Sequence, residues 1–364
     1  MKPHESFLVH HLCIAVIFLS GSAVDVRGIM LGGNQVARDS FLVFICMGNS
    51  NMSGRVAVSD QEVHPRLWRY HIPCGINGEP TEEQLHTWTP ARDPICGSGG
   101  GGPGMPLLKA MIDAYPDYYF GIMQHSGSGS KHYTCRDQFQ KGKDGYGTIL
   151  GAAMRERAEV TFAGIIAMLG DVEVQSTSGF SSWDHINNFA SDIASMVSSL
   201  REDLALPAGQ LPYLHTEIPY GEGLWDPATD ECTTLREQID QIPALIPHSA
   251  VISSEGITLK DDHHYNYNGY LMWADKVVEL VAENGWAPGH ESVSLRHSLR
   301  QSRRAPHAAF GTKIRLSNCV GCGAGYRIDG TPYTPATTAG RHPAGVLVYP
   351  GRSGWRKPKG TGKE

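Results

Sequence analysis

One serine of this chain stands where a buried strand should end. An apolar, β-prone run, Phe41-Leu-Val-Phe-Ile-Cys-Met-Gly48, precedes it, and Ser50 lies two residues beyond the glycine. Parallel α/β sheets place their ligand-binding residues at such carboxyl ends. A serine hydroxyl is protonated at neutral pH, so it acts as a nucleophile only beside a base, usually a histidine that a third group holds. Without such partners, Ser50 would simply cap the helix that follows the strand.

The partners are predicted in the run Asp261-Asp262-His263-His264. Asp261 and His264 have a D-x-x-H spacing, so a single turn can hold the carboxylate against the imidazole. Together with Ser50 they supply a nucleophile, a base and an orienting carboxylate, and such triads are defined by geometry rather than by chain order. His263 is the alternative base. The assignment would shift by one residue if Asp262 and His263, rather than Asp261 and His264, supplied the carboxylate and the imidazole.

The same acidic and histidine cluster has a second interpretation as a metal site. Carboxylates and imidazoles together suit manganese or zinc. Metallophosphoesterases need further clusters of His and Asp, and the sequence offers none in matching positions. The glycine run from Gly97 to Gly104 lacks the Gly-Lys-Ser/Thr ending of a phosphate-binding loop and the strand before it. We therefore predict no metal and no other cofactor.

Alternating strand-like and helix-like segments must position these residues. Such alternation is typical of a parallel sheet that helices cover on both faces. The predicted catalytic domain runs from about residue 35 to 288. Its further strands are predicted at Tyr118–Met123, Val160–Leu169, Leu211–His215 and Ala250–Ile252, and helices at Ile186–Leu204, Thr233–Ile246 and Gly269–Glu283.

The two ends of the chain differ from this domain. Residues 1 to about 23 resemble a secretory signal, with Lys2, an apolar run from Leu12 to Leu19 and small residues before Ala23. The run is too short for the roughly 20 residues that span a bilayer. Residues 289–309 are a predicted linker, and residues 310–364 a basic tail or a small β-module. From Glu291 on there are 13 Lys and Arg against 3 Asp and Glu, whereas the rest of the chain is acidic.

The chain has eight cysteines, of which Cys13 lies in the signal-like segment. Removal of a signal would leave seven of the eight, and outside the cell these can form disulfides with at least one thiol left over. Cys46 lies within the apolar strand and is the best candidate for a buried thiol. Cys319 and Cys322 have the C-x-x-C spacing of half a zinc or redox site, but no second pair follows at zinc-finger distance.

Six blocks in order resemble the motifs of SGNH-type carbohydrate esterases, the relatives of sialate O-acetylesterase and acetylxylan esterase. The first, Gly48-Asn-Ser50-Asn51-Met52-Ser-Gly54-Arg55, is similar to G-Q-S-N-M-x-G-R. The others are Trp88-Thr-Pro-Ala-Arg-Asp-Pro94 with Gly102-Pro103-Gly104, Gln124-His-Ser-Gly127-Ser-Gly129-Ser130, Gly164-Ile-Ile-Ala-Met-Leu169-Gly170-Asp171-Val-Glu173, Leu235-Arg236-Glu237-Gln238, and Asp261-x-x-His264 with Gly269. The similarity covers about residues 40 to 285.

This resemblance implies a fold and roles for named residues. The fold is a three-layer α/β/α sandwich with a parallel sheet, the flavodoxin-like fold of SGNH hydrolases. Ser50 is then the nucleophile, His264 the base and Asp261 the residue that orients it. The oxyanion hole is expected from the backbone N–H groups of Ser50 and Gly129, with Gly127 as the alternate.

The blocks also depart from the family pattern. Asn49 replaces a glutamine, and Asp171 and Glu173 exchange the family's Glu and Asp. Leu169 stands where the family has a glutamine whose side chain helps to complete the oxyanion hole, and leucine has no donor. Loss of one such donor costs roughly 10²- to 10³-fold in rate in other enzymes.

The resemblance predicts a secreted or extracytoplasmic serine esterase that removes O-acetyl groups from a carbohydrate of the acetylxylan or sialic acid type. Its partner is the acetylated carbohydrate, with no nucleic acid and no membrane span after signal removal. Two other functions stay open. Leu169 favours a catalytically weak or inactive carbohydrate-binding relative, and the same triad would serve a hydrolase of lipids or short-chain esters.

Overall fold

The computed structural model describes residues 27–57, 61–74, 80–96, 100–127, 134–178, 181–287, 325–326 and 332–333. The predicted secretory signal and the Cys319–Cys322 pair lie outside these residues. Within the described part of the chain, no helix is long and apolar enough to cross a membrane. None of the described cysteines forms a disulfide, and Cys46 is buried as predicted, which raises the pKa of its thiol.

A sheet of seven strands, in the order β5-β4-β6-β3-β7-β8-β9, forms the centre of the main unit. Its neighbouring strands are parallel except β5, which is antiparallel to β4 at the edge. The sheet strands are β3 (Phe41–Gly48), β4 (Leu67–Tyr70), β5 (Trp88–Pro90), β6 (Tyr119–Ser126), β7 (Thr161–Met168), β8 (Tyr213–Thr216) and β9 (Ser249–Ile252). β3 is buried along its whole length because sheet neighbours flank it and helices cover both faces.

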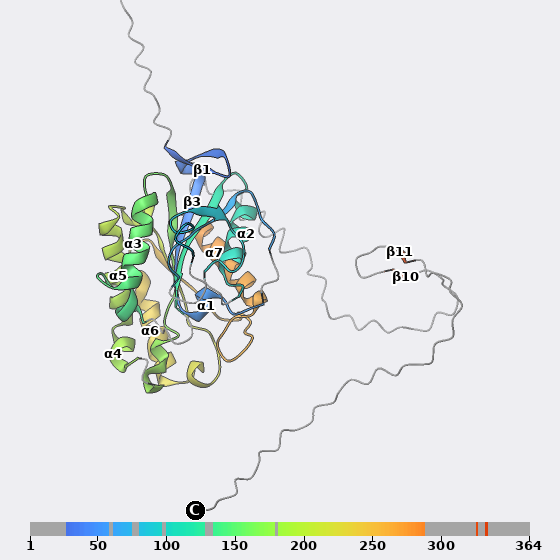
Figure 1. Ribbon diagram of the computed structural model, residues 1–364. Coiled ribbons are helices and arrows are strands. Elements are labelled where there is room, and N and C mark those ends of the chain that lie inside the picture. Colours follow the sequence, from blue (N-terminus) through green and yellow to red (C-terminus); the bar gives the residue numbers. More distant parts are fainter. Residues whose placement is uncertain are drawn as a thin grey trace, which may run out of the picture. The chain divides into compact units, whose positions relative to one another are not determined.

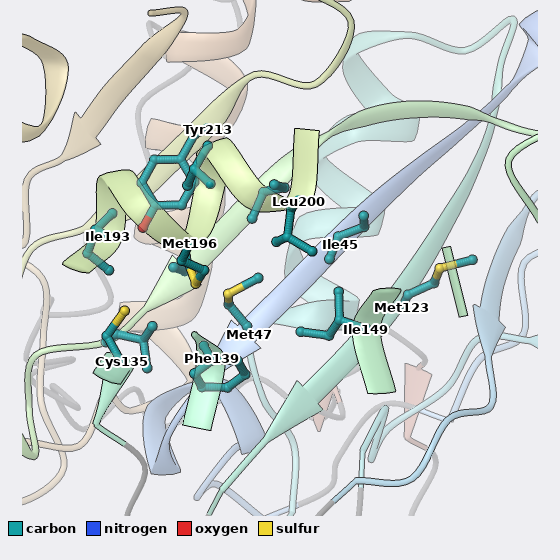
Figure 2. Close-up of a cluster of buried hydrophobic side chains, with 14 of the residues drawn as sticks. Ile45, Met47, Met123, Cys135, Phe139, Ile149, Ile193, Met196, Leu200 and Tyr213 are labelled. Carbon is teal, nitrogen blue, oxygen red and sulfur yellow. The ribbon is translucent and has the colours of Figure 1, made fainter. Parts of the chain in front are cut away.

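Helices cover both faces of this sheet, which confirms the predicted three-layer α/β/α architecture (Figure 1). On one face α3 (Asp144–Glu156), α5 (Phe189–Asp203) and α6 (Asp230–Leu245) pack on the strands. Figure 2 shows part of this core, where Met47 of β3 lies among side chains that include Met196 and Leu200 of α5. The other face is covered by α2 (Gly104–Ala114) and α7 (Tyr267–Glu283).

The remaining short elements connect these layers. α1 (Ser50–Ser53) follows β3 directly, and α4 (Trp183–Asn187) precedes α5. The predicted helix Ile186–Leu204 is therefore two helices, which meet at Asn188. An antiparallel hairpin of β1 (Gly28–Leu31) and β2 (Asn34–Ala37) precedes β3. Short helical turns complete this set at Arg38–Ser40, Cys135–Phe139, Glu173–Ser178, Ala208–Gln210 and Gly223–Trp225.

The chain divides into two units, and the second consists of residues 304–364. In its described part, β10 (Gly325–Tyr326) and β11 (Pro332–Tyr333) pair antiparallel. The assignment of residues 289–309 as a linker and 310–364 as a tail or small module stays a prediction.

Candidate active site

Ser50 is the first residue of α1, at the carboxyl end of the central strand β3. Gly48 makes this turn possible, because a Cβ atom there would lie 2.5 Å from the Met168 carbonyl oxygen at the end of β7. The close approach lets the Asn49 N–H donate to the same carbonyl at 3.2 Å. As the first residue of a helix, Ser50 has a backbone N–H without an intrahelical partner.

The structure brings Ser50, His264 and Asp261 together from segments more than 200 residues apart. The Ser50 Oγ lies 2.8 Å from His264 Nε2. On the other side of the ring, His264 Nδ1 lies 3.0 Å from both carboxylate oxygens of Asp261. This network assigns the proton of the neutral ring to Nδ1, which donates to Asp261, and leaves Nε2 to accept the serine proton.

The electrostatics keep His264 neutral and Asp261 charged. Burial, and then the neighbouring charge of His263, lower the pKa of His264 to about 4, although Asp261 acts in the opposite direction. Burial alone would raise the pKa of Asp261. Backbone N–H groups of His264 and His263 donate to its carboxylate and lower its pKa to about 2 instead. The pair therefore has the charge state of a base with its orienting group.

His263, the alternative base, occupies a different position. Its ring stacks on Trp225 at a centroid distance of 3.6 Å and an interplanar angle of 9°. Its Nδ1 lies 2.8 Å from an oxygen of Asp262. The two readings of the histidine cluster thus correspond to two separate pairs, and the pair that contacts Ser50 is Asp261 with His264. Nothing in the sequence pattern pointed to Trp225.

The four residues of the cluster also lie close enough to suggest a metal site, since their ligand atoms fall within 4.8 Å of one another. His264, however, uses both ring nitrogens for Ser50 and Asp261. A metal ion on that ring would displace one of these two hydrogen bonds. The geometry therefore favours the acid–base arrangement over ligation.

Asn51 holds the histidine segment in place, a role that the sequence pattern did not identify. Its Nδ2 donates to the His263 carbonyl oxygen at 3.1 Å, and its Oδ1 accepts the Tyr265 N–H at 3.0 Å. These two backbone groups flank His264. The residue next to the nucleophile therefore also fixes the backbone on both sides of the base.

Behind the nucleophile lies a buried polar pair. Asn49 Nδ2 donates to Asp171 Oδ1 at 2.8 Å, and both residues are buried. Asp171 also accepts from Trp225 through its backbone carbonyl, at 3.0 Å. Burial raises the pKa of the Asp171 carboxyl although Asn49 donates to it. Asn49 and Asp171, both departures from the pattern described above, are thus in direct contact.

Of the two glycines expected to supply an oxyanion donor, Gly127 and Gly129, the structure describes only Gly127. The Gly127 N–H donates to the Gly48 carbonyl oxygen at 2.9 Å, which extends the pairing of β3 with β6. An oxyanion role for Gly127 would require that bond to break. Gly129 lies outside the described residues. Leu169 follows β7 at the same edge and is buried in the core, where it supplies apolar contact and no donor.

Comparisons with known proteins agree with this fold. Residues 40–283 match a family described as carbohydrate esterase, sialic acid-specific acetylesterase. A structure of a protein from Arabidopsis thaliana is 17% identical, with a TM-score of 0.51 over 67% of this chain and 98% of its own. A carbohydrate acetylesterase from Xanthomonas citri is 16% identical, with a TM-score of 0.50, and the match covers 70% of this chain and 57% of that one. NanS is 14% identical, with a TM-score of 0.50, and the match covers 68% of this chain and 98% of NanS.

Proposed function

This chain belongs to the carbohydrate esterase, sialic acid-specific acetylesterase family, and we propose that Ser50, His264 and Asp261 carry out its removal of O-acetyl groups. The observation that supports these roles is the continuous hydrogen-bonded series from Ser50 Oγ through His264 to Asp261. Such a series is what activates a serine that is otherwise protonated.

In the first half of the reaction, Ser50 Oγ attacks the acetyl carbonyl carbon while His264 Nε2 takes the serine proton. Asp261 stabilises the imidazolium that forms and keeps its orientation. The negative charge on the carbonyl oxygen is stabilised by the Ser50 N–H, with Gly129 as the second proposed donor. His264 then gives its proton to the sugar oxygen, which leaves as a hydroxyl group, and the acetyl group stays on Ser50.

The second half returns the enzyme to its starting state. His264 removes a proton from a water molecule, and the resulting hydroxide attacks the acetyl carbon. The bond to Ser50 Oγ breaks, His264 returns the proton to that oxygen, and acetate leaves. Water is the only co-reactant, so the proposed chemistry needs no cofactor.

We also propose that the enzyme works outside the cytoplasm, on the basis of the signal-like N-terminal segment. Expression of the full chain, followed by N-terminal sequencing of protein from the medium or periplasm, tests this. A product that starts near residue 24 supports export. A full-length product that remains in the cytoplasm contradicts it.

Ser50→Ala tests the catalytic proposal directly. We expect kcat on p-nitrophenyl acetate and on acetylated xylan to fall on the order of 10⁴-fold or more, because the variant has no nucleophile. Ser191→Ala, which changes an exposed serine of α5, is the matched control and should keep full activity. Thermal melting shows whether both variants fold.

The outcomes separate the remaining functions. Wild-type protein that is no faster than Ser50→Ala would contradict catalysis and favour the carbohydrate-binding alternative, which the buried Leu169 supports. Activity that rises steeply with acyl chain length would favour a lipid substrate instead.

A further inference from the structure

The segment Asp261–His264, which carries the base and its carboxylate, belongs to no helix or strand. Its two acidic residues are exposed, and its two histidines are half-buried. The position of His264 relative to Ser50 therefore depends on what packs against this short segment. Asn51 holds its backbone from the side of the nucleophile. A second set of contacts comes from the chain between β8 and α6.

Trp225 is the anchor of this second set. It ends the helical turn Gly223–Trp225 and is only 8% exposed. Its indole ring belongs to the hydrophobic core on the face of the sheet that α5 and α6 cover. Its Nε1 donates to the Asp171 carbonyl oxygen at 3.0 Å. Because an indole has a single N–H donor, packing and this one hydrogen bond together fix the orientation of the ring.

The imidazole ring of His263 lies against this fixed indole. The two rings stack at a centroid distance of 3.6 Å and an interplanar angle of 9°. The centroid of the same imidazole lies 3.8 Å from that of the His264 ring. The His263 backbone N–H also donates to the Asp261 carboxylate at 3.2 Å. Through His263, Trp225 thus acts on both the base and the carboxylate that orients it.

The backbone of the same turn contacts Asp262. The Glu222 N–H donates to the Asp262 carbonyl oxygen at 3.0 Å. A Cβ atom at position 221 would lie 1.9 Å from that oxygen, so the close approach requires Gly221. The Gly221 N–H donates in turn to the Trp225 carbonyl oxygen at 3.2 Å. Ring stacking and backbone contact therefore join the turn to the segment that carries the base.

We propose that Trp225 is a positioning residue for catalysis, which holds His264 at Ser50 through the ring of His263. The proposal rests on the proposed function, because His264 acts as a base only in that reaction. Misplacement of a catalytic group by about 1 Å can lower a rate about 100-fold. Loss of the stacked indole should therefore lower kcat. KM should change little, because the buried indole offers a substrate almost no surface.

Two substitutions of Trp225 separate the stacking ring from the space that it fills. Trp225→Leu keeps an apolar side chain but removes the ring and the N–H donor. We expect its kcat on p-nitrophenyl acetate to fall about 10- to 100-fold, with KM within about twofold of the wild type. Trp225→Phe keeps an aromatic face for His263 and should retain kcat within about threefold. A wild-type kcat in Trp225→Leu, or equal losses in both variants, would overturn the proposal.

Trp68→Leu is the matched control for loss of a buried indole. Trp68 of β4 is buried, and its Nε1 likewise donates to a backbone carbonyl oxygen, that of Pro65, at 3.1 Å. This variant should melt at a lower temperature but keep kcat in assays well below melting. A loss of kcat as large as that of Trp225→Leu would assign the effect to stability and overturn the proposal.

Gly221→Ala tests the same contact with Trp225 in place. Its Cβ atom would force the turn away from the Asp262 carbonyl oxygen, so we expect kcat to fall about 10-fold or more. An unchanged kcat would show that the contact between the two segments does not position the base, which contradicts the proposal.

A phosphorylating reagent separates failure of this proposal from failure of the proposed function. Diethyl p-nitrophenyl phosphate transfers its phosphoryl group to an activated serine and releases p-nitrophenolate. We expect it to label Ser50 in the wild type, and to do so about 10-fold or more slowly in Trp225→Leu. Equal labelling rates would overturn the positioning role while the esterase stands. Wild type that is labelled at Ser50 but hydrolyses no acetyl ester would overturn the proposed function, and the labelling rates would still decide the role of Trp225.

Discussion

At the scale of single residues, burial and the neighbouring His263 both act on the pKa of the base, His264. Burial and His263 lower the pKa of His264 to about 4, and a general base must be neutral to accept a proton. Activity should therefore be present above that pKa and be lost as the pH falls through about 4. An unperturbed histidine would lose activity near its usual pKa of about 6.5.

His263→Phe tests this interaction while an aromatic ring still stacks on Trp225. Without the charge of His263, the pKa of His264 should rise toward its usual value. The acidic limb of kcat/KM on p-nitrophenyl acetate should then move to higher pH. Profiles between pH 3 and 8, with the wild type measured in the same buffers, give the shift. An unchanged acidic limb would mean that His263 does not act on the base.

Asn51 is a second single residue with a testable effect, as a positioning residue. Asn51→Ala removes both hydrogen bonds to the backbone around His264. Leaving two buried backbone groups without partners should cost about 1–3 kcal/mol of stability for each group. Because the base then loses its fixed position, we expect kcat to fall about 10- to 100-fold with little change in KM.

A fall in kcat without a change in KM would show that Asn51 positions the base, beyond any effect of Asn51→Ala on stability. Melting temperature monitors the fold, and assays run well below it. A variant that melts earlier but keeps kcat within twofold of the wild type would restrict Asn51 to a structural role. Asn51→Asp keeps the acceptor for Tyr265 and loses the donor to His263, so its kcat should lie between the wild type and Asn51→Ala.

At the scale of elements, five of the seven sheet strands were predictable, whereas β4 and β5 were not. The predicted strand before Ser50 matches β3, and the runs near residues 120, 165 and 213 correspond to β6, β7 and β8. Burial on both faces gives these strands an unbroken apolar pattern. β4 carries Arg69 and β5 ends in Pro90, as suits an edge. The sequences of β4 and β5 therefore lack the long unbroken apolar run that predicted the other strands.

At the scale of the whole molecule, the sequence predicted the fold class because its motifs occur in order along alternating elements. The D-x-x-H spacing and the resemblance of the last block also predicted that Asp261 and His264 lie with Ser50, and these three side chains are in contact. The polar cavity lined by Arg69, Arg92 and Asp93 could not be predicted in this way. Its lining comes from scattered positions between 61 and 124 that share no spacing, and only the folded chain brings them together.

The free energy of unfolding should depend on pH through one buried carboxyl group, that of Glu173. Its Oε1 accepts the Cys135 N–H at 2.8 Å, and no described group binds its Oε2. Burial raises the pKa of Glu173 to about 8, and the charge of Asp171 adds to the shift, although the Cys135 N–H opposes it. The folded protein therefore keeps a proton on Glu173 that the unfolded chain releases near the ordinary value of 4.5.

A native pKa above the unfolded one means that this contribution is complete below about pH 4.5 and is lost as the pH rises to about 8. Glu173→Gln keeps an acceptor for the Cys135 N–H but does not titrate. The free energy of unfolding, from urea titrations at pH 5, 6.5 and 8, should fall for the wild type relative to the variant by at most about 1.4 kcal/mol per pH unit. Because the charge of Asp171 acts on Glu173, the difference between the two proteins reports the titration of the pair. Parallel pH dependences for the two proteins would show that Glu173 is already ionised in the native state.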